Sequence, residues 1–112
     1  MKLSEQQFIF SRNFYKLFGA IFAMGYEVTF GECYRTTEQA LWNSQHGLGI
    51  KKSLHCDRMA IDLNIWKDGV LSNDPEDYSK AGKYWKALNP LNRWGGDFST
   101  LNDYYHFEMQ EQ

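Results

Sequence analysis

The sequence is poor in several features that mark whole classes of protein. Its 112 residues include only two cysteines, Cys33 and Cys56, too few for the disulfide framework of a small secreted domain. No apolar run approaches the roughly 18 residues that indicate a membrane-spanning helix. The formal net charge is −2, whereas a nucleic-acid-binding domain is usually basic. We therefore expect no nucleic-acid partner, no stable membrane insertion and no disulfide between the two cysteines.

A secretory signal peptide is also missing from the N-terminal segment. Glu5, Arg12 and Lys16 interrupt the stretch in which the apolar core of a signal would have to lie. We expect a protein made in the cytoplasm that needs a separate route if its substrate lies outside. The aromatic content of 17% excludes disorder. The length fits one domain, residues 1–112, and we expect a monomer.

Apolar residues recur at helical spacing over residues 3–24, and Gly25 is a typical residue to end that helix. Residues 26–34 alternate between apolar and polar, which predicts a half-buried strand. Thr36 with Gln39 is a capping-box pair and predicts a short helix to about residue 44.

The second half of the chain predicts a hairpin, a helix and a final strand. Residues 60–65 alternate with period two, and Asp68-Gly69 indicates a tight turn that starts the return strand. Asp74-Pro75 predicts a helix that Asn89-Pro90 ends, and residues 104–109 alternate again. The order of elements indicates an α+β fold with a small, mainly antiparallel sheet and helices on one side of it.

Two further local patterns have simple interpretations. Trp94 to Asp97, with two glycines between them, predicts a turn where the backbone can approach another segment closely. The acids Asp74, Glu76 and Asp77 could suggest a calcium site, but we interpret them as favourable charges at a helix N-terminus.

The polar faces of two predicted strands indicate a metal site. Asp62 and His106 each alternate with apolar neighbours, so both emerge on one face if the apolar sides share a core. His55 must then be brought round by a turn at residues 56–58. Two imidazoles and a carboxylate suit zinc, which in catalytic sites has three protein ligands and water. Asp103, in the turn before the last strand, is the best-placed free carboxylate for proton transfer.

Residue spacing alone leaves other interpretations open. A histidine on a strand is more often a hydrogen-bonded structural residue than a ligand, and Cys56 beside His55 is a rival ligand. Arg35, between the first strand and the following helix, could equally form a surface salt bridge. A metal-free interaction domain also stays possible on these grounds.

The motifs as a set resemble those of a known family. Ser53-x-His55 followed by Ala60-x-Asp62 resembles the SxHxxGxAxD motif of the VanY-like D-Ala-D-Ala carboxypeptidases of the M15 metallopeptidase family. Asp103-x-x-His106 resembles its second motif, and Tyr34-Arg35-Thr36 with Gln39 resembles its upstream arginine motif. Arg58 stands where the motif has glycine.

This resemblance implies the α+β fold of the hedgehog and D-Ala-D-Ala peptidase group. It implies zinc held by His55, Asp62 and His106, Asp103 as general base, and Arg35 as the residue that binds substrate oxygen or the developing oxyanion, with Gln39 and Ser53 also on the substrate. The small size is most similar to phage endolysins that cleave the L-alanyl-D-glutamate bond of the peptidoglycan stem peptide. The alternatives are a D,D-carboxypeptidase or dipeptidase acting at terminal D-Ala, and a non-catalytic zinc domain of the same fold.

Overall fold

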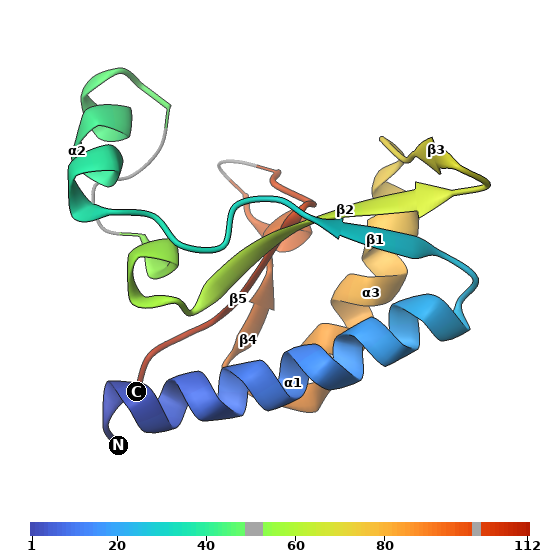
Figure 1. Ribbon diagram of the computed structural model, residues 1–112, viewed down its shortest axis with the longest axis horizontal. Helices are drawn as coiled ribbons and strands as arrows, with labels where there is room; N and C mark the ends of the chain where they lie inside the picture. The colour runs from blue at the N-terminus through green and yellow to red at the C-terminus, as the bar shows by residue number, and fades with distance from the viewer. Residues whose placement is uncertain (49–52, 100–101) are drawn as a thin grey trace.

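The computed structural model describes residues 1–48, 53–99 and 102–112. It has a five-stranded antiparallel sheet with two long helices against it and a third helix standing apart (Figure 1). The elements are α1 (Leu3–Ala23), β1 (Glu27–Phe30), α2 (Thr37–Gln45), the 3-10 helix η1 (Leu54–Asp57), β2 (Ala60–Lys67), β3 (Val70–Leu71), α3 (Pro75–Leu88), β4 (Asn92–Trp94), the 3-10 helix η2 (Gly95–Asp97) and β5 (His106–Met109).

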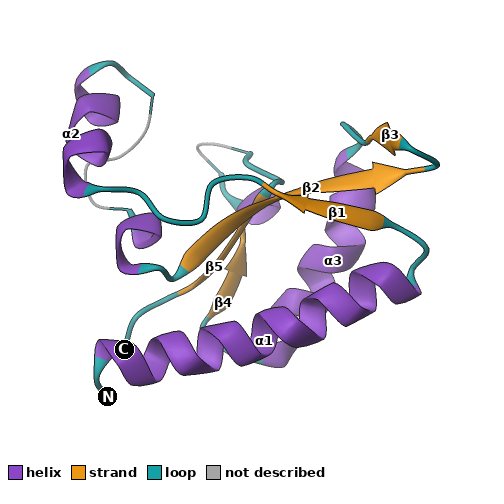
Figure 2. Ribbon diagram, in the orientation of Figure 1, coloured by secondary structure: helices purple, strands orange, loops and turns teal. Residues whose placement is uncertain are grey.

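The long strand β2 lies at the centre of the sheet and pairs with different strands along its length. Its first half pairs with β5, from Ala60 opposite Glu108 to Asp62 opposite His106. Its second half pairs with β1 and, at its end, with the short β3. β4 completes the order β1-β2-β5-β4 (Figure 2).

The hydrophobic core lies between the sheet and the pair α1 and α3. Phe10 and Phe14 of α1 contact the ring of Trp85 of α3, with ring centroids 5.6 Å and 4.7 Å apart. Trp85 is fully buried, and its indole N–H donates to the carbonyl of Glu108 on β5 at 2.9 Å. This contact ties the core directly to the strand that carries His106. In α2, by contrast, only Ala40 is buried.

Most predicted elements are confirmed, with two corrections. The first strand was expected over residues 26–34 but spans Glu27–Phe30. Gly31 and Glu32 still exchange main-chain hydrogen bonds with Asp62 beyond the end of the strand, and the chain then leaves the sheet toward α2. The stretch from Trp94 was expected to be a turn alone. Trp94 in fact ends strand β4, and η2 follows. Three residues are too few for a visible alternation.

The caps are confirmed. Thr36 accepts a hydrogen bond from the Gln39 N–H, and Asp74 accepts one from the Glu76 N–H. Gly25 has φ +91°, the left-handed region that suits glycine after a helix. Both cysteines are free. In the described ranges, no helix is both long and apolar enough to cross a membrane.

Asp77 is a buried carboxylate that joins three segments. It accepts hydrogen bonds from the Ser72 hydroxyl at 2.6 Å and from the Tyr26 hydroxyl at 3.0 Å. The hydrogen bond from Ser72 is the largest effect on its pKa, which lies below the ordinary value despite burial.

We expect Asp77→Asn to lower the free energy of unfolding at pH 7 by about 1–3 kcal/mol, because a buried charge-assisted pair is lost. The pKa of Asp77 is lower in the folded protein than in the unfolded chain, where it is about 3.9. Its charge therefore stabilises the folded protein above pH ~3.9, and this stabilisation is lost as the pH falls through the folded-state pKa. Urea unfolding at pH 7 and pH 3 should show the difference between wild type and variant shrinking in acid. Glu76→Gln, an exposed neighbour, is the control. An unchanged difference would contradict the charge-based explanation.

Candidate metal centre and active site

Strand pairing brings Asp62 and His106 together. They lie directly opposite each other in the β2–β5 ladder, so their side chains share a face of the sheet, as predicted. Asp62 Oδ1 is 3.1 Å from His106 Nδ1. The main chain of Asp62 is also held from the other side, because its N–H donates to Glu32 and its carbonyl accepts from Gly31.

His55 reaches the pair from the short helix η1. Ser53 caps this helix by accepting from the His55 N–H at 3.2 Å. Arg58 ends it with φ +57° and ψ +37°, a left-handed conformation. This is the turn that the sequence required, built with an arginine where the family motif has glycine. His55 is 2% exposed, and its Nε2 lies 3.3 Å from Asp62 Oδ1 and 3.2 Å from His106 Nδ1.

The three side chains fit a zinc ion. Among the described residues, one group of potential metal ligands is found. It consists of His55, Asp62 and His106, whose donor atoms all lie within 4.8 Å of one another. The observed separations of 3.1–3.3 Å are close to those around a tetrahedral ion, whose bonds of about 2.0–2.2 Å place ligand atoms roughly 3.3–3.6 Å apart. Nitrogen and oxygen donors in this ratio are those of catalytic zinc sites. Cys56, the rival ligand, is not in the group.

Each imidazole is oriented by a hydrogen bond through its other nitrogen. His106 Nε2 lies 2.6 Å from Glu108 Oε1, and His55 Nδ1 lies 3.2 Å from the carbonyl of Cys33. These acceptors favour a proton on the outer nitrogens, which leaves His106 Nδ1 and His55 Nε2 facing inward as ligands. The sequence analysis missed Glu108. Its position two residues from His106 on the same strand, and therefore on the same face, was the available signal.

Charge pairing shifts the pKa values of this group. Burial opposes charge on Asp62, but hydrogen bonds with His106 and His55 outweigh it and lower its pKa to about 2. Burial likewise opposes charge on His106, and its bonds to Asp62 and Glu108 raise its pKa to about 9. The negative carboxylates of Asp62 and Glu108 thus stabilise a positive charge on His106, and the same negative charge favours a cation bound in this cluster.

Arg35 lies at the edge of the site and is mostly buried. Its Nε donates to Glu32 Oε1 at 2.9 Å and its Nη2 contacts the same oxygen. Its backbone N–H donates to the His55 carbonyl at 3.2 Å. The salt bridge that sequence spacing allowed is therefore present, and the arginine also lies next to His55. Glu32, its partner, was not predicted.

Asp103 lies in the turn before β5, as predicted. Its carbonyl accepts from the His106 N–H, and its N–H donates to the Gly95 carbonyl, both at 3.0 Å. A Cβ on Gly95 would lie 2.0 Å from the Asp103 carbonyl oxygen, so only glycine permits this approach. Burial and the nearby charge of Asp62 raise the Asp103 pKa. Within the described residues, no hydrogen bond or ion pair engages its carboxylate.

Gln39 and Ser53, the other expected substrate residues, have structural contacts instead. Gln39 donates to Asn43 on its own helix at 2.6 Å and is exposed. Ser53 caps η1 and is 6% exposed. Direct contact of either with substrate stays a prediction.

Comparison with known proteins agrees with the fold and the site. An M15 peptidase family model, described as D-alanyl-D-alanine carboxypeptidase, matches residues 37–109, more than half of the chain. The fold and the His-Asp-His group define a metallopeptidase domain. The chain belongs to the M15 family of zinc metallopeptidases. No curated protein sequence matches it.

Two solved structures share the fold. One is the Serratia marcescens L-Ala D-Glu endopeptidase ChiX, with a TM-score of 0.65 and 22% identity over 74% of this chain and 66% of that one. The other is the vancomycin resistance D,D-pentapeptidase VanY, an E175A mutant in complex with Zn(II), with a TM-score of 0.62 and 20% identity over 89% of this chain and 70% of that one. The chain thus spans about two thirds of the length of these structures.

Glu108 should matter for metal affinity. We expect Glu108→Gln to weaken zinc binding about 10–100-fold, because an outer-shell carboxylate orients its histidine and increases its basicity. Competition with a chromophoric chelator measures this without reference to turnover. Glu27→Gln, an exposed residue on β1, is the control. Equal affinity in wild type and Glu108→Gln would contradict the role assigned to Glu108.

Proposed function

We propose that this protein is a zinc-dependent peptidoglycan peptidase that hydrolyses the L-alanyl-D-glutamate bond of the stem peptide. The observation that carries the proposal is the convergence of His55, Asp62 and His106 with inward-facing donor atoms, next to the turn that holds Asp103. Family membership supports the peptidase class. The fold shared with an L-Ala D-Glu endopeptidase supports the choice of bond.

The residues of the site divide the chemistry. His55, Asp62 and His106 would hold the zinc ion, which when bound supplies Lewis acidity and lowers the pKa of water. Asp103 accepts the proton of the attacking water and returns it to the leaving amine. Arg35 donates N–H groups to the substrate oxygen on which negative charge develops. Glu32 keeps the Arg35 side chain oriented through their ion pair.

A D,D-carboxypeptidase activity on terminal D-Ala is the second candidate. The description of the matching family model and the fold shared with VanY favour it. The same residues would act in both reactions, so the difference lies in how the peptide is held. The products distinguish them, because this activity releases D-alanine.

The biological setting in this proposal is that of a phage endolysin. The protein would be made in the host cytoplasm and reach the cell wall after release by another factor. We propose residues 1–112 as one catalytic domain that works as a monomer. The packing of α1 on α3 supports a single domain, since α1 supplies much of the core although it precedes the matched region.

Digestion of Gram-negative peptidoglycan tests the proposal directly. We expect wild-type protein to separate L-Ala from D-Glu, a chelator to abolish cleavage, and added zinc to restore it, with products identified by mass spectrometry. Release of D-alanine would favour the second candidate. A protein that binds one zinc ion per chain and cleaves nothing would be a non-catalytic zinc domain.

Asp103→Asn should keep zinc and lose turnover by roughly 10²–10⁴-fold, the usual contribution of a general acid–base residue. Metal content and peptide hydrolysis are measured on the same preparation. Asp97→Asn is the matched control, since Asp97 is an exposed acid paired with Lys86. Full activity in Asp103→Asn would exclude Asp103 as the general base.

A further inference from the structure

Arg93 is an arginine close to the metal group that plays no part in the chemistry described above. It belongs to β4, and the ladder places it directly opposite Glu108 on β5. Glu108 is two residues from His106 on the same strand. Because residues opposite each other and residues two apart share a face, Arg93, Glu108 and His106 lie in a row on the metal-binding side of the sheet.

Glu108 divides its two carboxylate oxygens between these neighbours. Its Oε1 lies 2.6 Å from His106 Nε2. Its Oε2 accepts a hydrogen bond from Arg93 Nε at 2.8 Å and also contacts Arg93 Nη2. Since a carboxylate is planar and rigid, the hold on Oε2 fixes the direction in which Oε1 points. Without Arg93 the group would be held at one oxygen, and it could rotate away from the imidazole.

The surroundings keep the Arg93 side chain in place. The Phe98 ring lies with its centroid 5.4 Å from the guanidinium carbon and 5.9 Å from the His106 ring centroid, so one aromatic side chain lies beside both groups. On β2 the residue opposite Glu108 is Ala60, whose methyl group forms no hydrogen bond with a carboxylate.

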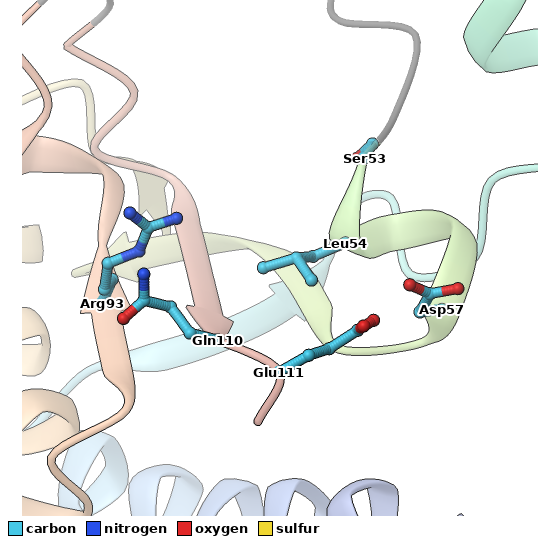
Figure 3. Close-up of a pocket in the computed structure, with 6 residues that line it drawn as sticks. All are labelled: Ser53, Leu54, Asp57, Arg93, Gln110 and Glu111. Carbon is cyan, nitrogen blue, oxygen red and sulfur yellow. The ribbon is translucent and has the colours of Figure 1, made fainter. Parts of the chain in front are cut away.

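The outer side of Arg93 faces a recess of about 280 Å³, where Gln110 lies beside it (Figure 3). The recess is lined by Ser53, Leu54, Asp57, Arg93, Gln110 and Glu111. The Arg93 side chain is 47% exposed, whereas that of Glu108 is 7% exposed. Arg93 can therefore be replaced without opening the core, and its effect on the buried carboxylate can be measured.

We propose that Arg93 is a positioning residue of the metal site, which acts through Glu108 to hold His106 in the orientation that binds zinc. This inference rests on the metal group and is independent of which peptide bond is cleaved. The charge of Arg93 alone would have the opposite effect, because a nearby cation repels Zn²⁺. A contribution of Arg93 in favour of zinc binding therefore comes from the orientation of the ligand.

Two substitutions separate orientation from charge. Arg93→Gln removes the charge and the paired N–H groups, whereas Arg93→Lys keeps the charge and loses the fork geometry. We expect Arg93→Gln to bind zinc about tenfold more weakly, at the lower end of the range for outer-shell partners, and Arg93→Lys to lie between it and wild type. Competition with a chromophoric chelator measures both. Arg12→Gln, which changes an exposed arginine of α1, is the matched control.

A double-mutant cycle tests the route through Glu108. If Arg93 acts only by orienting this carboxylate, Arg93→Gln should cause no further loss of zinc affinity in a protein that already carries Glu108→Gln. An equal loss in both backgrounds would show that Arg93 acts by another route and would overturn the proposal.

The His106 Nε2–H proton gives a readout that a general loss of stability does not move. In zinc-loaded wild type, NMR of protein with labelled histidine should show this proton hydrogen-bonded and slow to exchange with solvent. In Arg93→Gln it should exchange faster, as in Glu108→Gln, while the Arg12→Gln control keeps the wild-type signal.

The outcomes do not depend on turnover, so they separate this inference from the proposed function. Unchanged or tighter zinc binding by folded Arg93→Gln would overturn the positioning role, even if the variant unfolds at a lower temperature. If Arg93→Gln does not fold, Arg93→Lys decides, and wild-type zinc affinity with wild-type proton exchange in that variant would overturn the proposal. A protein that binds zinc as expected but cleaves no peptide would overturn the proposed function and leave the role of Arg93 standing.

Discussion

The register between β2 and β5 is the constraint on which the site depends. A shift of one residue would turn Asp62 and His106 to opposite faces. Core contacts oppose that shift, because Phe107 and Leu63 are fully buried and the Trp85 indole binds the Glu108 carbonyl. Hydrophobic packing on one face of the sheet therefore sets the geometry of the ligands on the other. The relative positions of His106 and Asp62 are therefore fixed by the packing of the core.

The charges of the site explain how a metal-binding cluster folds around buried ionisable groups. Asp62 and Glu108 would be costly to bury unpaired, yet each contacts an imidazole of the site, and Glu108 also contacts Arg93. The contacts of His106 with both carboxylates outweigh burial and raise the pKa of this histidine. Because metal ligands must be deprotonated, a bound cation replaces protons on the ligands, and its affinity depends on pH.

Sequence reasoning succeeded where hydrophobic periodicity or a cap pattern marked an element, and failed where the chain is irregular or the element is very short. Period-two alternation around Asp62 and His106 predicted their shared face, and cap residues predicted the starts of α2 and α3. The ion pair of Arg35 with Glu32 and the cap that Ser53 forms on η1 are short-range contacts. They lie in irregular segments that no periodic pattern marks, so the sequence did not identify the partners. The strand β4 is too short for its period to be visible.

The arginine at the glycine position of the motif shows how such a departure is accommodated. A left-handed residue with a Cβ costs roughly 1–2 kcal/mol. The Arg58 guanidinium lies 4.1 Å from the ring centroid of Tyr34, a cation–π contact worth about 0.5–1 kcal/mol at an exposed site. A glycine here would add about 0.5–1 kcal/mol of chain entropy to be lost on folding. The two effects together offset most of the strain, so the turn that carries His55 tolerates arginine, and the side chain gains a second attachment to the segment that holds Arg35.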